Sequence, residues 1–206
     1  MVQTIVYLIR HGQTEWNLET RMQGHKDSPL TRVGITQAKG LHNRLMKGKI
    51  DLIYSSESKR AYDTARIIKG HQDIPIYIKN ELREINMGEW EGMKQSDIIN
   101  KYPQIWNNFW NNPIQYTPVG QGESYNKFKN RIITEVENII NSNQGKNIAI
   151  ITHRIALKVI MLHFNNQDII NIGNFPDIQP ASLSQICIND GVYQILLYGD
   201  ISHYKY

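Results

Sequence analysis

The sequence contains one cysteine and lacks any long apolar run. Cys187 has no partner for an internal disulfide, and its place in the apolar run 183–188 favours a buried structural thiol over a catalytic one. No neighbouring residue in the sequence would activate it as a nucleophile. Apolar stretches such as 148–151 and 192–197 are far shorter than the roughly 20 residues of a membrane-spanning helix. We therefore expect a reducing compartment and no membrane span.

A targeting segment is not recognisable at the start of the sequence. Residues 1–4 lead directly into an apolar run, without a basic leader or a small-residue cleavage site. Together with the lone cysteine, this predicts a cytoplasmic protein.

Charge of either sign is not concentrated anywhere along the chain. The 23 basic and 19 acidic residues give a formal net charge of +4 and a pI near 9.0. This balance favours anionic ligands, but the basic residues are dispersed, so nucleic acid is not indicated as a partner. Hydrophobic residues form 40% and charged residues 20% of the 206 residues, as in a globular chain. We expect a single domain over residues 1–206.

Short motifs for metals and nucleotides are also missing. The sequence has no His-x-x-x-His or Cys-x-x-Cys element, and Gly12 and Gly24 form neither a GxGxxG nor a P-loop pattern. Arginines close to the candidate histidines described below would repel a divalent cation. We therefore expect no metal and no cofactor, and any phosphate would be held by side chains.

Apolar segments with strand and helix periodicity alternate along the chain. The predicted strands are 4–9, 51–56, 74–78, 147–152, 183–188 and 192–198, and the predicted helices are 30–46, one beginning near Ser58, 123–143 and 155–163. Thr31 is the expected N-cap of the first helix, and Asn189-Asp190-Gly191 is a hairpin turn. This order predicts an α/β fold with a mainly parallel sheet covered on both faces, to which the last hairpin adds an antiparallel strand at one edge.

Polar residues follow the carboxyl ends of the first four predicted strands. They are Arg10 with His11, the segment 55–60 with Arg60, the segment 82–84 with Glu84, and His153 with Arg154. In parallel sheets these ends lie on one edge, where ligands bind. Each residue alone has a plainer explanation: a structural histidine, a solvated Arg60, or Glu84 as a surface partner of Arg83, worth about 0 to 1 kcal/mol. Their occurrence together at the ends of successive strands favours a ligand-binding or catalytic site.

The residue types in this set suit phosphoryl transfer. Arg10 and Arg60 can bind phosphate oxygens in bidentate fashion. A neutral His11 is a competent nucleophile toward phosphorus, and His153, if protonated, would stabilise charge on the phosphoryl oxygens in the transition state. Glu84 would protonate the leaving alkoxide and then deprotonate the attacking water, which requires a raised pKa.

Several motifs together resemble one family. Residues 8–17 read LIRHGQTEWN, residues 27–31 read DSPLT, residues 82–84 read LRE, and residues 152–153 read TH. These motifs resemble the histidine phosphatase superfamily, in its branch similar to cofactor-dependent phosphoglycerate mutase, over nearly the whole chain. The resemblance implies a three-layer α/β/α sandwich and a small phosphomonoester as substrate.

The resemblance also implies roles for individual residues. His11 is expected to be the phosphorylated nucleophile and Glu84 the proton donor. The residues expected to bind the substrate or form the charged floor of its phosphate pocket are Arg10, Thr14, Asn17, Gln23, Gly24, Arg60 and His153. Gly24 is included because a residue without Cβ lets the chain approach a ligand closely.

Two positions depart from the family pattern. Family members often have glycine where this chain has Arg154, whose side chain either adds a cation to the pocket or turns outward. Mutases of this type usually have glutamate where this chain has Gln13.

The segment 93–122 decides between related activities. We expect it to act as a lid that determines specificity, and it contains Lys94 and Lys101 but no arginine, unlike the inserted segment that grips the substrate in phosphoglycerate mutases. This favours hydrolysis over the mutase alternative. The aromatic residues Trp106, Phe109 and Trp110 either pack a helix against the domain or contact the substrate.

A third alternative is a non-catalytic module that binds phosphate or phosphopeptides. Such a module needs no proton donor, so Glu84 argues against it. The predicted hairpin at 183–198 offers an edge on which a second copy of the chain could pair, which leaves a homo-oligomer open.

Overall fold

The computed structural model describes residues 3–46 and 48–204. The first two residues of the segment 1–4, in which a targeting signal was sought, lie outside this range. Within it the chain forms six strands, seven α-helices and three short 3-10 helices. The strands are β1 (Gln3–Arg10), β2 (Leu52–Ser56), β3 (Ile76–Lys79), β4 (Asn147–Thr152), β5 (Leu183–Asn189) and β6 (Val192–Asp200). The α-helices are α1 (Glu15–Leu18), α2 (Arg32–Leu45), α3 (Lys59–Lys69), α4 (Gln95–Lys101), α5 (Pro103–Asn111), α6 (Tyr125–Asn141) and α7 (Arg154–Phe164). The 3-10 helices are η1 (Asn80–Leu82), η2 (Gly88–Trp90) and η3 (Ile169–Asn171).

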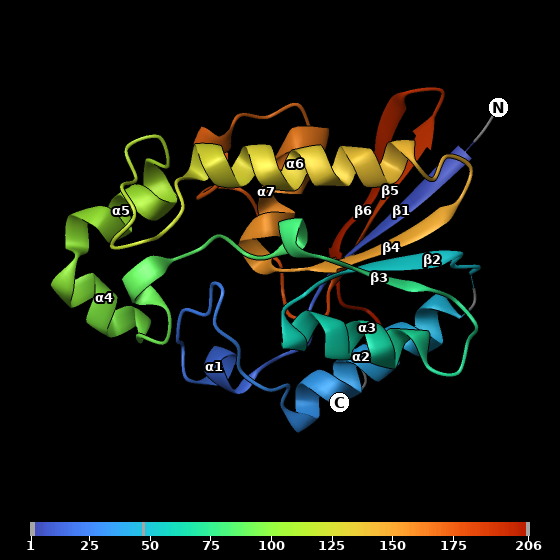
Figure 1. The fold of residues 1–206 in the computed structure, drawn as a ribbon, viewed down its shortest axis with the longest axis horizontal. Coiled ribbons are helices and arrows are strands. Elements are labelled where there is room, and N and C mark those ends of the chain that lie inside the picture. The colour runs from blue at the N-terminus through green and yellow to red at the C-terminus, as the bar shows by residue number, and fades with distance from the viewer. Residues whose placement is uncertain (1–2, 47, 205–206) are drawn as a thin grey trace.

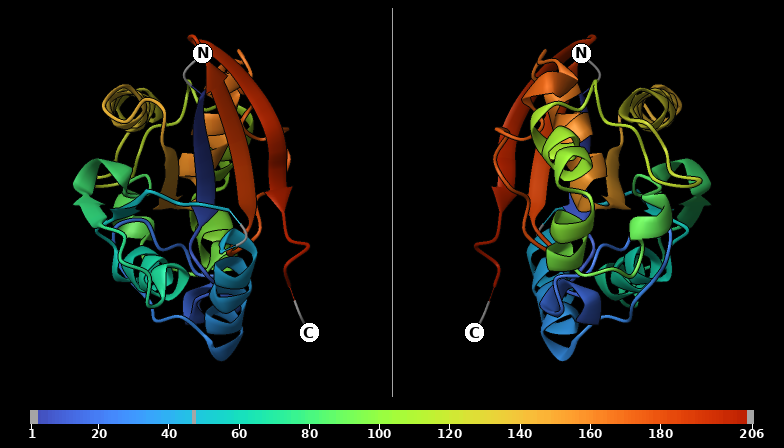
Figure 2. Two further views of the ribbon diagram at one scale, coloured as in Figure 1. Left: turned by 90° about the vertical axis from the view of Figure 1, so that its right-hand side faces the viewer. Right: turned by 90° about the vertical axis from the view of Figure 1, so that its left-hand side faces the viewer.

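The strands form one sheet in the order β3-β2-β4-β1-β5-β6. Strands β3, β2, β4 and β1 are parallel, β5 runs antiparallel to β1, and β6 pairs antiparallel with β5 at the edge (Figure 2). The prediction of a mainly parallel sheet is confirmed. The predicted antiparallel strand is confirmed as part of a hairpin at one side of the sheet. Strand β5 runs opposite to the parallel strands, and β6 forms the edge.

Helices cover both faces of the sheet, with α6 and α7 on one side and α2 and α3 on the other (Figure 1). Strand β4 shows why its sequence is apolar throughout. Ile148 and Ile150 belong to the core under α6 and α7, whereas Ala149 and Ile151 belong to the core under α2 and α3. A strand buried on both faces has no polar side, so the three-layer sandwich is confirmed.

The predicted helix starts follow from capping. Thr31 caps α2 by accepting a hydrogen bond from the Gly34 amide at 2.9 Å, and Ser124 caps α6 in the same way. The short helices α1, α4 and α5 were not predicted. Helix α4 has seven residues, too few for a clear apolar period, and α5 begins at Pro103 inside an Asn-rich and Trp-rich segment.

Helices α4 and α5 lie together at one end of the molecule, on the same side as α1 (Figure 1). They stand over the carboxyl ends of the parallel strands rather than on a face of the sheet. Across the described parts of the chain, none of the helices is long and apolar enough to span a membrane.

The chain after β1 is pressed against the first turn of α2. A Cβ added at Gly12 would lie 2.6 Å from the Gly34 carbonyl oxygen, and one added at Gly34 would lie 2.1 Å from the Gln13 carbonyl oxygen. The Thr31 amide also donates to the Gln13 carbonyl at 2.9 Å. This close approach fixes the backbone next to His11.

We predict that Gly34→Ala destabilises the protein, although glycine to alanine inside a helix normally stabilises by about 1 kcal/mol. The added methyl group would meet backbone atoms that cannot rotate away, so the free energy of unfolding should fall by about 1–3 kcal/mol. Urea denaturation followed by tryptophan fluorescence measures this change. Lys39→Ala, on the exposed side of the same helix, is the control, and a gain in stability for Gly34→Ala would contradict the prediction.

Candidate active site

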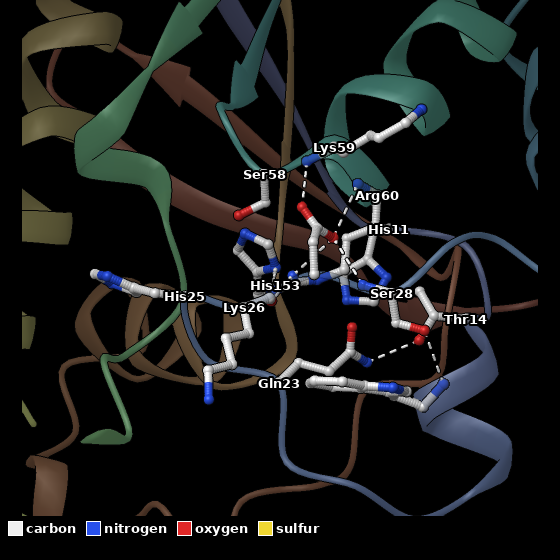
Figure 3. Close-up of polar contacts among 12 residues, drawn as sticks. His11, Thr14, Gln23, His25, Lys26, Ser28, Ser58, Lys59, Arg60 and His153 are labelled. Carbon is white, nitrogen blue, oxygen red and sulfur yellow. Dashed lines mark hydrogen bonds and ion pairs between the residues drawn. The ribbon is translucent and has the colours of Figure 1, made fainter. Parts of the chain in front are cut away.

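The polar residues that follow the strands meet at one edge of the sheet, as predicted. Arg10 and His11 follow β1, Arg60 lies in the first turn of α3 after β2, and Glu84 follows β3 and η1. These four residues line one cavity of about 70 Å³. His153 follows β4 and lies behind the cavity, with its ring centroid 5.3 Å from that of His11 (Figure 3).

The imidazole of His11 is neutral and has one nitrogen available. Its Nδ1 lies 2.8 Å from the Gly12 carbonyl oxygen, which only accepts hydrogen bonds, so Nδ1 carries the proton and Nε2 carries the lone pair. Burial, and then the cations of Arg60 and Arg10, hold the pKa of His11 well below its usual value near 6.5. This is the state required of a nitrogen nucleophile.

The ring of His153 has a protein partner at each nitrogen. Arg60 Nη2 donates to Nδ1 at 3.1 Å, so the proton resides on Nε2, which donates to Ser56 Oγ at 2.8 Å. Burial and the Arg60 cation hold the pKa of His153 well below 6.5. The predicted electrostatic role of His153 required a protonated ring, whereas the ring is neutral in this hydrogen-bonding arrangement.

Arg60 is buried, with 1% of its surface exposed, and is not the solvated helix residue of the plainer explanation. Its guanidinium donates to the carbonyl oxygens of Lys26 at 2.7 Å and Gly24 at 2.8 Å. It also pairs with Asp27 at 3.0 Å. The Asp27 carboxylate accepts from the backbone amides of Lys59 and Arg60 as well, so it caps α3 from a distant loop. Asp27 was not predicted as a site residue, because it lies in the loop between α1 and α2 and not at the end of a strand.

Arg10 also lines the cavity. Its Nη1 donates to the Ile178 carbonyl at 2.6 Å, and burial, followed by the nearby cation of Arg154, lowers its pKa to about 10. Arg10 therefore stays charged at neutral pH. Within residues 3–46 and 48–204, neither Arg10 Nε nor Arg60 Nε has a hydrogen-bond acceptor, although both are buried. Unpaired donors of this kind are costly unless an anion meets them.

Glu84 is 5% exposed and is held at the N-terminus of α7. Its carboxylate accepts from the amides of Ile155 at 2.9 Å and Ala156 at 3.0 Å. Burial raises the pKa of Glu84 above 4.5, and these amides and the Arg60 cation only partly oppose that effect. Arg83 pairs with Glu57 instead, so the surface-pair explanation of Glu84 is wrong.

Arg131 of α6 supports the backbone that carries Glu84. Its guanidinium donates to the carbonyl oxygens of Glu81 at 2.6 Å, Arg83 at 3.1 Å and Glu84 at 3.3 Å. It also binds the Glu123 carboxylate through two nitrogens, at 3.1 and 2.7 Å. Arg131 was not predicted, because it lies in the middle of a long helix, where arginine is normally solvent-exposed.

Three of the other predicted pocket residues, Asn17, Gln23 and Gly24, line the cavity. Thr14 does not line it. The Thr14 hydroxyl is buried behind Gln23, whose Nε2 donates to it at 2.8 Å (Figure 3). Thr14 also caps α1 by accepting from the Asn17 amide at 3.3 Å. Thr14 therefore orients Gln23, and its contact with a substrate stays a prediction.

Gly24 has a structural requirement in addition to the predicted one. Its φ is +54°, and a Cβ there would lie 2.2 Å from Glu91 Oε1. The Glu91 carboxylate accepts from the amides of His25 at 2.7 Å, Lys26 at 3.0 Å and Met87 at 3.1 Å. It thereby fixes the loop that contains the acceptors of Arg60.

The aromatic residues of the segment 93–122 divide between the two predicted roles. Phe109 is fully buried and Trp106 packs on it at 6.3 Å between ring centroids, so both residues pack α5 onto the domain. Trp110 lines the cavity, and the Arg154 guanidinium lies 5.1 Å from the centre of its ring.

Two further arginines border the cavity. Arg154 lines it, which supports a cation at the pocket over an outward-turned side chain. Arg21, which was not predicted as a site residue, lines it as well. Both arginines come from outside the arginine-free segment 93–122. Gln13 lies away from the cavity and accepts a hydrogen bond from the Thr31 hydroxyl at 2.9 Å.

Comparison with known proteins gives consistent matches over the whole chain. The profile of the histidine phosphatase superfamily (branch 1) matches residues 6–201. A putative phosphoserine phosphatase 2 of Hydrogenobacter thermophilus is 32% identical over 169 residues, which cover 82% of each chain. The metal-independent phosphoserine phosphatase of Arabidopsis thaliana is 30% identical over 202 residues, covering 97% of this chain and 83% of that one.

Solved structures agree with these sequence matches. Bacillus stearothermophilus YhfR superposes with a TM-score of 0.93 at 37% identity, covering 97% of this chain and 98% of that one. The alpha-ribazole phosphatase from Shigella flexneri superposes with a TM-score of 0.86 at 27% identity and covers 96% of both chains.

We predict that His11 and His153 both titrate below pH 6.5. Burial and the arginine cations disfavour the charged ring, so both rings should remain neutral as the pH falls through 6.5 and gain a proton only below it. Histidine ring NMR signals, assigned with His11→Gln and His153→Gln, measure this. Removing the cation in Arg60→Met should raise the pKa of His153, whereas Arg32→Met, on the exposed face of α2, should leave it unchanged. Titration of both rings at or above 6.5 in the wild type would contradict the prediction.

Proposed function

Because the chain belongs to the histidine phosphatase superfamily (branch 1), we propose that it hydrolyses small phosphomonoesters through a covalent phosphohistidine on His11, without a metal ion. The relatives named phosphoserine phosphatase and alpha-ribazole phosphatase support hydrolysis over the mutase alternative. The observation that carries the proposal is the shared cavity. It brings together a lone pair on His11, unpaired donors of two buried arginines, and a buried carboxyl group on Glu84.

The phosphoryl group binds between Arg10 and Arg60. Both arginines line the cavity, and their two cations offset the two negative charges of the ester. A cavity of about 70 Å³ accommodates a phosphoryl group, whereas the alcohol part must extend toward the mouth. Asn17 and Gln23 line the same cavity and can donate further hydrogen bonds from their amide groups.

The first chemical step transfers the phosphoryl group to the protein. His11 Nε2 attacks phosphorus, an N–P bond forms, and the bond between phosphorus and the ester oxygen breaks. Glu84 gives its proton to the departing oxygen, so the alcohol leaves neutral and Glu84 becomes a carboxylate. His153 acts as a neutral donor and acceptor that holds the Arg60 guanidinium in place beside the phosphoryl oxygens.

The second step regenerates the protein. The Glu84 carboxylate takes a proton from water, the hydroxide formed attacks phosphorus, and the N–P bond breaks to release inorganic phosphate. Glu84 is then protonated and His11 neutral, as at the start. Two fixed guanidinium groups provide the charge stabilisation that a metal ion supplies in other phosphatases.

The proposal extends to the domain organisation and to the segment 93–122. The chain functions as a single domain over residues 1–206, in which the segment 93–122 with α4 and α5 covers the cavity mouth as a specificity lid. A cytoplasmic location and a homo-oligomer paired through β6 stay predictions.

We predict that p-nitrophenyl phosphate hydrolysis proceeds in EDTA and is lost in His11→Ala, which has no nucleophile. The phosphohistidine is detected with a substrate that carries a radiolabelled phosphoryl group. After a rapid quench, the wild-type protein should carry a label that is labile in acid and stable in base. His71→Ala, at an exposed histidine, is the matched control and should behave as wild type. Equal rates for His11→Ala and wild type would overturn the proposal.

A second incubation separates hydrolysis from the mutase alternative. When the protein acts on 3-phosphoglycerate with trace 2,3-bisphosphoglycerate, we expect it to form more inorganic phosphate than 2-phosphoglycerate.

We predict a bell-shaped pH dependence of kcat/KM for alkyl phosphates. Activity should fall as the pH rises through the raised pKa of Glu84, because the proton donor is lost, and fall as the pH drops through the lowered pKa of His11, because the nucleophile is protonated. Glu84→Gln should lower kcat/KM for an alkyl phosphate about 10²–10⁴-fold and abolish the alkaline limb. The burst of p-nitrophenol should persist in this variant, because that leaving group needs no proton. Equal losses for both substrates would refute the assignment.

A further inference from the structure

The position of Glu84 determines where the alcohol part of the substrate lies. The Glu84 carboxylate is bound to the amides of Ile155 and Ala156, the second and third residues of α7. If Glu84 protonates the ester oxygen, as the proposed function holds, that oxygen lies beside the first turn of α7. The alcohol must therefore extend past Arg154, the first residue of this helix.

Arg154 presents two free groups to that position. Its Nε pairs with Asp177 Oδ1 at 2.6 Å, and 32% of its side chain is exposed. No acceptor among the described residues meets its Nη1 or Nη2 within hydrogen-bond distance. Because Arg154 lines the same cavity as His11 and Glu84, these two groups can donate to a ligand that occupies the cavity.

The guanidinium of Arg154 is held in orientation before any ligand binds. Asp177 fixes its Nε, and the ring of Trp110 lies 5.1 Å from its centre. Lys158, one turn along α7, lies 5.6 Å from the centre of the same ring and adds a second positive charge. A planar fork held on two sides loses less entropy when it binds an anion.

The cavity itself is too small for the alcohol. Its volume of about 70 Å³ accommodates the phosphoryl group, so substituents of the alcohol are recognised at the mouth. Apart from Glu84, which must be protonated in the first step, no acidic residue of the described chain lines the cavity. Asp177 reduces the positive charge of Arg154 but occupies only its Nε.

From this geometry we infer that Arg154 binds a second anionic group on the alcohol, within a few bonds of the ester oxygen. The preferred substrates are then phosphomonoesters of hydroxy acids or of alcohols that bear a second phosphate. The recognition chemistry, a guanidinium fork with an oxyanion, is the same for both classes.

Matched substrate pairs test the inference through kcat/KM. O-phosphoserine and O-phosphoethanolamine differ by one carboxylate, as do 3-phosphoglycerate and glycerol 3-phosphate. Ethylene glycol bisphosphate and 2-hydroxyethyl phosphate differ by one phosphate. We expect the wild type to prefer the more anionic member of at least one pair at least tenfold, and the pair concerned identifies the anion.

The variant Arg154→Ala should remove that preference. It should lose about 10- to 100-fold in kcat/KM for the more anionic substrate, the size expected for charged hydrogen bonds. The loss for its partner should stay below about threefold. Arg154→Lys, which keeps the charge without the fork, should retain part of the preference. Arg32→Ala is the matched control, because Arg32 is the exposed first residue of α2.

The outcomes separate this inference from the proposed function. Hydrolysis of p-nitrophenyl phosphate, which carries no second anion, reports whether Arg154→Ala is folded and chemically competent. If that hydrolysis depends on His11 but the wild type shows no preference in any pair, the inference is overturned and the proposed function stands. Equal losses for both members of a pair in Arg154→Ala would also overturn it. If hydrolysis does not depend on His11, the proposed function itself fails.

Discussion

The buried guanidinium of Arg60 is the group on which the geometry of the site depends. It joins the loop that carries Gly24 and Asp27, the start of α3, and His153 at the end of β4. Burying a cation is costly, and the cost is offset here because carbonyl oxygens, a carboxylate and a ring nitrogen all accept from it. Arg60 also lines the cavity. One side chain therefore positions three segments and contributes a cation to the site.

Burial and the same cation together shift the pKa values of the groups around Arg60. Burial, and then the cation, lowers the pKa of both histidines, while burial keeps the pKa of Glu84 raised despite the nearby positive charge. The pKa of the histidines is thus shifted down and that of the carboxyl group up within one small cavity, the directions that a neutral nucleophile and a proton donor require. The support behind this arrangement comes from elsewhere in the chain, since Arg131 holds the backbone of Glu84 and Glu91 holds the loop around Gly24.

The sheet, its flanking helices and the charged floor of the site were predictable because each depends on local pattern. Apolar runs such as 147–152 predict strands buried on both faces, and the rule for parallel strand ends selects Arg10, His11, Glu84 and His153. The contacts that support the floor were not predictable in this way. Asp27 and Arg131 act through bonds to backbone atoms distant in sequence, and no periodicity or spacing marks such bonds.

The features that were not predicted have equally specific causes. Thr14 lies in a family motif close to His11, but the motif does not show that its hydroxyl accepts a hydrogen bond from the Gln23 amide. The positive φ of Gly24 is consistent with the glycine, but only the structure identifies Glu91 as the neighbour. Helices α4 and α5 were missed because short segments rich in asparagine and tryptophan have weak apolar periodicity.

In the proposed cycle, the guanidinium groups of Arg10 and Arg60 affect product release as well as substrate binding. Inorganic phosphate would present the same oxygens to them as the ester, so hydrolysis alone would not weaken the contacts of the phosphoryl group with the floor. Compared with the ester, inorganic phosphate lacks only the contacts that the alcohol part makes at the mouth of the cavity. In this cycle the turnover rate would depend on how quickly a small dianion dissociates from two buried cations, and free phosphate would compete with substrate for the same site.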